Sequence, residues 1–297
     1  MSASVHAAFR HERAFQAGRP LAVLVAAVLA GCSTAREPTA PYLEAAAAEA
    51  RSAQEAYLGG RFGDAIVGLR EAVRLHLAAG DLPGAARSQL NLALAERAAA
   101  DHPGAAVAAA RLRDLTRGAV QQVREGAGAR SADAPTEAEL EASSGWLGAL
   151  LALDEGDVAQ AQALAPPAGL ELASSSQMRG RIETLRATIA VRSGRFGEAV
   201  KLADTGRIAS EDAHDLSEVA HAWSLEGEGR AGMGDWPGAR GDYLAAVALE
   251  ERMGGGARMA EDLRQLAVVS EHLGDSGDAK LYSLRAEAIA AARDEHH

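Results

Sequence analysis

Few residues in this sequence have the types and spacing that catalysis or metal binding requires. It contains no Gly-x-Ser-x-Gly nucleophile motif, no His-Glu-x-x-His zinc motif, no phosphate-binding P-loop and no Cys-x-x-Cys pair. His214 and His221 are seven residues apart, so they could share one face of a helix, but they lack a third ligand nearby. We therefore expect a non-catalytic protein without a metal or a cofactor.

The strongest chemical signal is a single cysteine behind an apolar run. Arginines at 10, 13 and 19 precede the ten apolar residues 21–30, which are too few to span a bilayer but typical of a signal peptide. The run ends at Leu29-Ala30-Gly31-Cys32, and Cys32 is the only cysteine, so it can form no internal disulfide. The alternative is a signal peptide that is cut elsewhere, with an incidental cysteine.

The segment 29–32 resembles the lipobox of bacterial lipoproteins. That resemblance implies that residues 1–31 are removed and that Cys32 is diacylated and becomes the first residue of the mature chain. In Gram-negative members an aspartate after the cysteine tends to retain the protein in the inner membrane, so Ser33 implies the outer membrane. Residues 32–41 contain two prolines and are expected to form a tether.

Charge narrows the possible partners. The chain carries a net charge of −11; three arginines and one glutamate give residues 1–31 a charge of +2, so the rest carries −13. Such a surface is a poor match for nucleic acid or anionic lipid headgroups. Membrane attachment is therefore expected to come from acyl chains, and the partners are expected to be proteins.

A six-residue segment recurs through the rest of the chain, and its clearest copy is Gly-Asp-Trp-Pro-Gly-Ala at 234–239. Gly234 can take a positive φ and end one helix, Asp235 can cap the next, and Pro237 falls in the first turn, where its missing N–H costs nothing. Ala239 is small enough for two helices to approach closely. We call this segment the joint; its seven copies begin at residues 60, 80, 100, 156, 194, 234 and 274.

The spacing of the joints predicts an α-solenoid. Most joints recur every 38–40 residues, with the copy at 80 midway between two others, which fits two helices per repeat. The interval from 100 to 156 is longer, which indicates an insertion at about 118–136, a helix extension followed by a loop. The solenoid is expected over 42–293 and a frayed tail over 294–297.

These repeats resemble the tetratricopeptide repeat (TPR). The fifth helix pair, about 213–252, carries the resemblance best, through Trp223, Gly227, Gly234, Trp236, Ala239, Tyr243 and Ala246. The period near 40 departs from the 34 residues of that family. The resemblance implies an all-α, tetratricopeptide-like α-α superhelix, a solenoid of about six helix pairs, with both tryptophans in the core.

The family binds peptides on the concave surface that is lined by the first helix of each pair. The Lys and Asn positions with which many members hold a C-terminal carboxylate are occupied here by other residues, including Ser224, Glu228 and Thr184. Recognition is therefore expected to use arginines on first helices, and the candidates are Arg87, Arg97, Arg181 and Arg192.

Together these features predict a lipid-anchored periplasmic scaffold for protein–protein interactions in an envelope assembly. Pilus or secretin pilotins, outer-membrane assembly subunits and regulators of cell-wall synthases are examples of this class. The alternative is a periplasmic enzyme or ligand-binding lipoprotein with a site near the 118–136 insertion. An ordered cavity with convergent titratable groups would favour that alternative, and an open groove would favour the scaffold.

Overall fold

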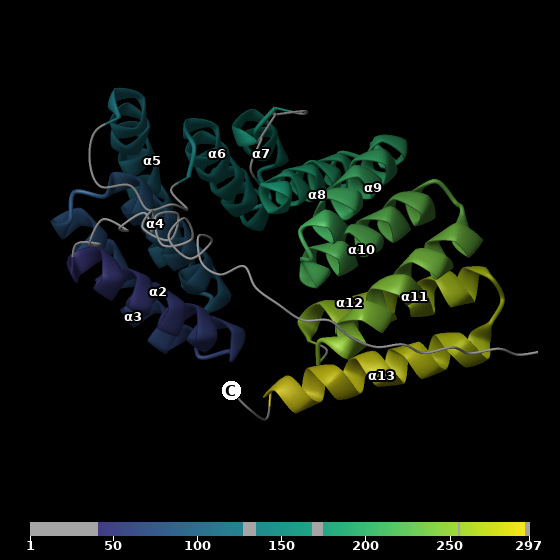
Figure 1. Ribbon diagram of the computed structural model, residues 1–297. Helices are drawn as coiled ribbons and strands as arrows, with labels where there is room; N and C mark the ends of the chain where they lie inside the picture. Colours follow the sequence, from purple (N-terminus) through teal and green to yellow (C-terminus); the bar gives the residue numbers. More distant parts are fainter. Residues whose placement is uncertain (1–40, 127–134, 168–174, 255, 295–297) are drawn as a thin grey trace, which may run out of the picture. The chain divides into compact units, whose positions relative to one another are not determined.

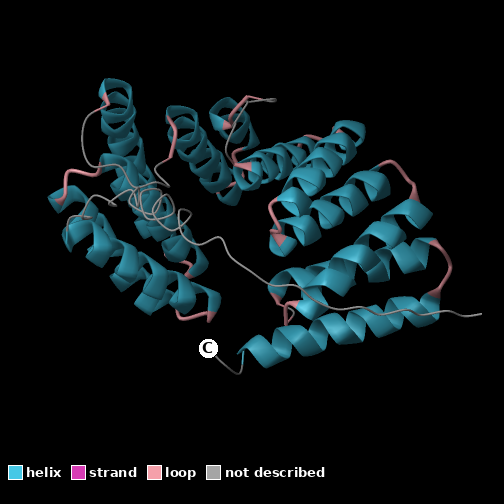
Figure 2. Cartoon of the chain, in the orientation of Figure 1, coloured by secondary structure: helices cyan, strands magenta, loops and turns pink. Residues whose placement is uncertain are grey.

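The computed structural model describes residues 41–126, 135–167, 175–254 and 256–294, which form twelve helices and no strand (Figures 1 and 2). The expected signal peptide, Cys32, the tether up to residue 40 and the tail residues 295–297 lie outside the described residues. The helices are α2 (Pro41–Leu58), α3 (Phe62–Ala78), α4 (Leu82–Ala98), α5 (His102–Glu125), α6 (Glu137–Asp154), α7 (Val158–Leu164), α8 (Ser176–Arg192), α9 (Phe196–Asp212), α10 (Leu216–Gly232), α11 (Trp236–Arg252), α12 (Ala257–His272) and α13 (Ser276–Asp294).

The helices form six antiparallel pairs, from α2–α3 to α12–α13 (Figure 1). Each helix packs against the next one in the chain, and the first helices of neighbouring pairs also touch, as in α4–α6, α6–α8 and α8–α10. Contacts of this kind bury one continuous core along a stack of repeats. The all-α, tetratricopeptide-like superhelix that the sequence predicts is therefore the observed fold.

Each joint ends one helix in the same way. At the clearest copy, Gly234 has φ 80° and its N–H donates to the carbonyl of Ala231 at 2.9 Å, while the N–H of Asp235 donates to the carbonyl of Arg230 at 2.9 Å. These two bonds form a Schellman motif. The Asp235 carboxylate then accepts from the N–H of Gly238 at 3.1 Å, so it caps α11 as expected.

The alanine that ends each joint is buried. The exposed fraction of Ala65, Ala85, Ala105, Ala161, Ala199 and Ala239 is 0%. A methyl group at this position lets the second helix lie close against its neighbours, where a longer side chain would force the backbones apart. The repeated small residue is therefore a packing requirement, as the sequence indicates.

Two features of the helices depart from a regular repeat. Helix α5 continues through the first part of the 118–136 insertion and ends at Glu125, and Gly126 after it has φ 67°. Helix α7 has only seven residues. An eighth joint, which lacks the expected glycine, begins at His214, where φ is 56°, and Asp215 caps α10.

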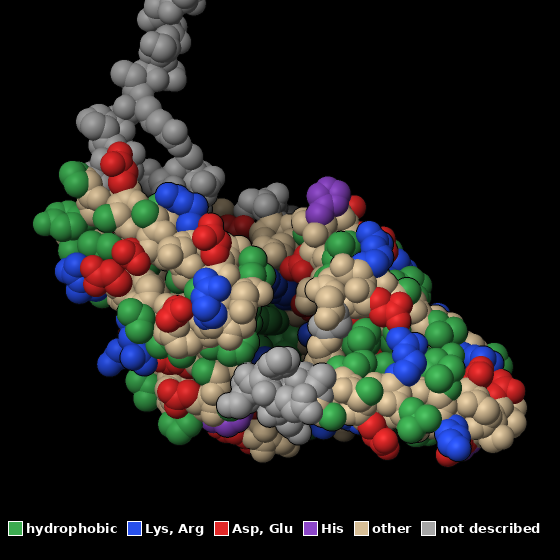
Figure 3. Space-filling view, turned by 90° about the horizontal axis from the view of Figure 1, so that it is seen from below, with side chains coloured by type: hydrophobic (Ala, Val, Ile, Leu, Met, Phe, Trp, Pro, Cys, Tyr) green, Lys and Arg blue, Asp and Glu red, His purple; other side chains and the backbone are tan. Residues whose placement is uncertain are grey.

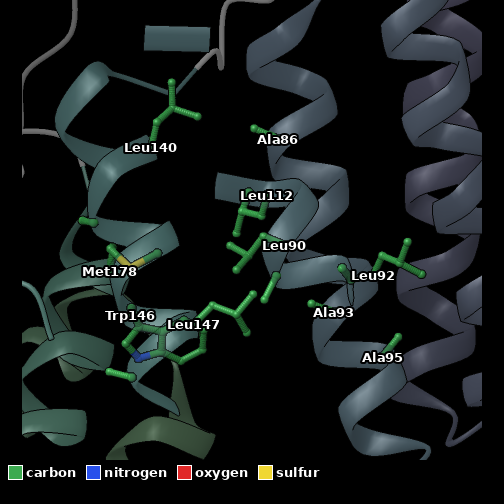
Figure 4. Close-up of a cluster of buried hydrophobic side chains, with 14 of the residues drawn as sticks. Ala86, Leu90, Leu92, Ala93, Ala95, Leu112, Leu140, Trp146, Leu147 and Met178 are labelled. Carbon is green, nitrogen blue, oxygen red and sulfur yellow. The ribbon is translucent and has the colours of Figure 1, made fainter. Parts of the chain in front are cut away.

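The largest core cluster joins helices α2 to α8 (Figure 4). Leu90 and Leu112 meet Leu147 and Trp146 across the space between α4, α5 and α6. Within the part of the chain that the structure describes, no helix combines the length and the apolar composition needed to cross a membrane.

Ala239→Leu should lower the free energy of unfolding by about 1–3 kcal/mol, because the added carbons have no space at a fully buried position. The matched control is Ala248→Leu, at an exposed position of the same helix, which should change stability by no more than about 0.5 kcal/mol. Urea unfolding followed by circular dichroism measures both. Equal effects of the two substitutions would contradict the packing role of the joint alanine.

Candidate functional site

A cavity of about 750 Å³ opens on the first helices of the N-terminal pairs. Helices α2, α4, α6 and α8 supply most of its lining, and α3 and α5 contribute one leucine each. This is the surface on which the tetratricopeptide resemblance places partner binding. The cavity is therefore the strongest candidate site in the described residues.

The floor of the cavity is aliphatic and its rim is polar. Leu90, Leu112, Leu140 and Met178 line it and also belong to the hydrophobic core cluster (Figure 4). Amide, hydroxyl and guanidinium groups surround this floor, from Gln54, Asn91, Ser143, Gln177, Arg87 and Arg181. The space-filling view shows a hollow with hydrophobic side chains in its floor, on a face where acidic and basic side chains are interspersed (Figure 3).

Arg181 is held in place at the edge of the cavity. Its guanidinium carbon lies 5.8 Å from the centre of the Trp146 ring, and Nη2 lies 3.6 Å from Oδ2 of Asp215. Trp146 itself is fixed, because its indole Nε1–H donates to the carbonyl oxygen of Arg181 at 3.0 Å. A guanidinium ordered by a ring and a carboxylate loses less freedom when it binds an anion.

Only two of the four arginines predicted to bind a partner line this cavity, Arg87 and Arg181. Arg97 forms a bidentate ion pair with Asp154, at 2.5 Å and 2.8 Å, and so joins α4 to α6. Arg192 is exposed in the last turn of α8, and it is not part of the cavity lining. Of the four candidates, the cavity therefore brings together Arg87 and Arg181.

The end of the insertion borders the cavity. Pro135 and Glu139 are among the lining residues. Glu139 lies in a capping box at the start of α6: the N–H of Glu139 donates to Oγ1 of Thr136 at 3.3 Å, and the N–H of Thr136 donates to Glu139 Oε2 at 2.8 Å. The capping box fixes where the chain re-enters the fold after the insertion.

Polar contacts also tie together α8, α10 and α12, the first helices of the last three pairs. Thr184 donates its hydroxyl to Glu218, which joins α8 to α10. Burial favours the neutral acid, but hydrogen bonds from His221 and Thr184 outweigh it and lower the pKa of Glu218 to about 2. Thr184 and Ser224, which stand at positions where many tetratricopeptide proteins bind a carboxylate, are both buried here.

The second tie joins α10 to α12. The Ser224 hydroxyl donates to Oδ2 of Asp262 at 2.7 Å, and both side chains are buried. Burial raises the pKa of Asp262 to about 7 although the Ser224 hydrogen bond opposes this, and the nearby Glu250 carboxylate adds to the increase. Burial also raises the pKa of Glu250 to about 7.

The two tryptophans of the fifth repeat do not form one binding pair. Trp236 stacks on His272, with ring centroids 3.7 Å apart, and Arg207 lies over Trp223 at 4.5 Å. Both rings are half-buried, and each packs against a different side chain. These separate contacts fit a structural role for each tryptophan. Among the described residues, no group of three or more His, Cys, Asp or Glu side chains is placed to hold a metal ion.

Comparison with known proteins shows the fold. No protein-family model and no curated protein matches the sequence. Among solved structures, BtubC (BKLC) from P. vanneervenii is similar with a TM-score of 0.53 and 19% identity over 87% of this chain and 94% of that one.

Two Rap structures are also similar. The apo form of RapI has a TM-score of 0.55 and 7% identity, covering 84% of this chain and 66% of that one. A Rap protein complexed with Competence and Sporulation Factor has a TM-score of 0.52 and 11% identity, covering 84% and 77%. These similarities support the helical-repeat superhelix.

Asp262→Asn should remove part of the pH dependence of stability. A carboxyl whose pKa is about 7 in the folded protein and about 4 in the unfolded chain stabilises the fold below pH 4, and this contribution is lost as the pH rises to 7. The free energies of unfolding of the variant and the wild type should therefore differ less at pH 5 than at pH 8. At pH 8 the variant should be more stable, by roughly 4 kcal/mol at most.

The measurement is urea unfolding of both proteins between pH 5 and pH 8. Glu271→Gln is the matched control, because it removes an exposed carboxylate from the same helix, α12. The prediction is wrong if Asp262→Asn keeps the wild-type slope of stability against pH.

Proposed function

We propose that this protein is a lipid-anchored scaffold of the bacterial cell envelope, which binds a segment of a partner protein in the cavity formed by α2, α4, α6 and α8. The observation that carries the proposal is the lining of that cavity, in which an aliphatic floor is bordered by Arg87 and Arg181. Apolar anchors in a groove supply affinity, while a few charged groups at the rim fix orientation and select the partner.

The side chains that line the cavity indicate which kind of segment it would bind. Leucine-sized side chains fit the floor, carboxylates fit the arginines, and the amides of Gln54, Asn91 and Gln177 can pair with a backbone. An extended segment with apolar and acidic side chains meets all three conditions. A helical segment meets only the first two, because its backbone groups already pair within the helix. The Rap protein complexed with Competence and Sporulation Factor is an example of a bound factor on a similar fold.

Membrane attachment is assigned to Cys32. The segment Leu29-Ala30-Gly31-Cys32 and the apolar run before it support export and diacylation, and Ser33 supports the outer membrane over the inner one. Two acyl chains give stable anchoring, which one chain does not. The scaffold would then face the periplasm and serve an assembly such as a pilus or secretin, an outer-membrane assembly complex or a cell-wall synthase.

A second candidate function is binding of a small anionic ligand, or catalysis on one, in the same cavity. Its volume lies in the range of small-molecule sites, and Pro135 at the end of the insertion borders it. The titratable lining consists of Tyr57, Arg87, Glu139 and Arg181, and Glu139 is already engaged in its capping box. This set suits recognition of an anion better than acid–base catalysis, so the protein scaffold remains the first proposal.

Cys32→Ser should release the protein from membranes or leave its signal peptide uncleaved, because the acyl chains have no attachment point. Fractionation of cells that express the wild type and the variant, with mass spectrometry of the mature N-terminus, measures this. Ser33→Ala is the control, and it should stay anchored. Normal processing and membrane retention of Cys32→Ser would rule out the lipid anchor.

Arg87→Glu/Arg181→Glu should weaken partner capture by at least tenfold, since each substitution replaces attraction to a carboxylate with repulsion. Capture of envelope proteins after cross-linking, quantified by mass spectrometry, measures this, and circular dichroism checks the fold. Arg111→Glu, on an exposed position of α5 outside the cavity, is the matched control.

Arg192→Glu tests whether binding extends along α8 beyond the cavity, and it should have little effect. A partner list that is unchanged by the double substitution would place the binding surface elsewhere. Loss of a bound small anion in native mass spectrometry, without loss of any protein partner, would favour the second candidate function.

A further inference from the structure

The outer side of α13 carries a continuous apolar stripe. Leu281 and Leu284 are 54% and 53% exposed, and Gly277, Ala288 and Ala291 are exposed as well. Their spacings of four, three, four and three residues form the seam of a heptad repeat. The stripe therefore has the pattern of a helix that packs against another helix.

This stripe is separate from the side of α13 that packs on its own repeat. Ala279 and Ala286 are buried, and Tyr282 and Ile289 pack against the core cluster of α11 and α12. In Figure 1, α13 lies at the edge of the helix stack, next to α12. A terminal helix of a solenoid normally has a polar outer face, which keeps the protein soluble. The exposed leucines depart from that rule.

Charged residues flank the stripe, with one basic and one acidic side chain on each edge. With Leu281 and Leu284 as the core positions a and d, Lys280 and Glu287 occupy the two g positions on one edge. Both are exposed, and neither forms a hydrogen bond or ion pair with another described residue. On the opposite edge, Asp278 pairs with Arg240 and Arg285 pairs with Glu251, so those charges already have partners within the chain.

We propose that α13 is the interface of a homodimer, in which a second copy of this chain packs its own α13 antiparallel across the stripe. In an antiparallel helix pair, g positions face g positions. Lys280 would then meet Glu287 of the partner subunit, and the two-fold axis would repeat the pair. Leu281 would pack against Leu284 of the partner subunit at the centre, and Gly277 would lie opposite Ala288 of the partner subunit.

The charges beside the stripe also favour the antiparallel orientation of the two α13 helices. In a parallel pair, each g position faces the e position five residues later, which would place Lys280 against Arg285 of the partner subunit. Two such like-charge contacts are unfavourable, whereas the antiparallel pair has two favourable ones. One surface that is complementary to itself through a two-fold axis is the pattern of an isologous dimer.

The test is sedimentation equilibrium on the full chain with Cys32→Ser, which avoids acyl chains and does not depend on the partner-binding cavity. Lys280→Glu alone and Glu287→Lys alone should each weaken self-association by about tenfold, because both repeated pairs become repulsive. In an equimolar mixture, the two variants should form mixed dimers with about the affinity of the wild-type dimer, because each mixed dimer again has two pairs of opposite charge. Lys201→Glu, at an exposed position on α9, is the matched control and should associate as the wild type does.

A wild type that stays monomeric at its highest soluble concentration overturns the proposal. So does a mixture that fails to recover, or single variants that dimerise like the wild type. Leu284→Gln provides an independent check, and its self-association should also be weaker while its helicity is unchanged. Site-specific cross-linking from position 284 to a different envelope protein, with no dimer, would assign the stripe to that protein.

Discussion

The fold depends on a backbone geometry that most residues avoid. Each joint requires one residue with a positive φ, and the residue after it takes the N-cap position of the next helix. An aspartate at that position caps α4, α5, α7, α10 and α11. Glycine takes a positive φ without strain, and it occupies six of the eight joints. Ala100 and His214 adopt a positive φ with a side chain, at φ 59° and 56°. At both, the next aspartate caps the following helix, which partly offsets the strain.

Because the joints turn every helix back on the previous one, the first helices of successive pairs become neighbours. Their alignment is then set by polar contacts between them: Arg97 with Asp154, Thr184 with Glu218, and Ser224 with Asp262. Such contacts are directional, whereas aliphatic packing alone tolerates sliding of one helix along another. The contact between Arg97 and Asp154 joins α4 to α6, two of the helices that line the cavity, so it helps to fix the positions of their side chains there.

The sequence is informative where the determinants are local. Positive φ at Gly234, the cap from Asp235 and the burial of Ala239 all follow from residue types within one segment, and the structure confirms each. The joint at His214 was missed because the expected glycine is absent. The role of Arg97 could not be predicted, because its partner Asp154 is 57 residues away and depends on how the repeats pack. The exposed stripe of α13 could not be predicted either. The sequence does not show which side of this helix packs on its own repeat, so it does not show which side remains exposed.

The cavity and the buried carboxylates with raised pKa values lie in different parts of the solenoid. In the N-terminal pairs, the surface keeps an aliphatic floor exposed to a cavity, with arginines at its edge. In the C-terminal pairs, Asp262 and Glu250 are buried with raised pKa values, which makes that part of the protein less stable at neutral pH than an apolar core would be. A buried carboxylate is retained at such a cost where it fixes one packing arrangement among several. On this reasoning the buried carboxylates of the C-terminal pairs hold a defined packing geometry, whereas the surface that we propose for partner binding lies at the other end of the solenoid.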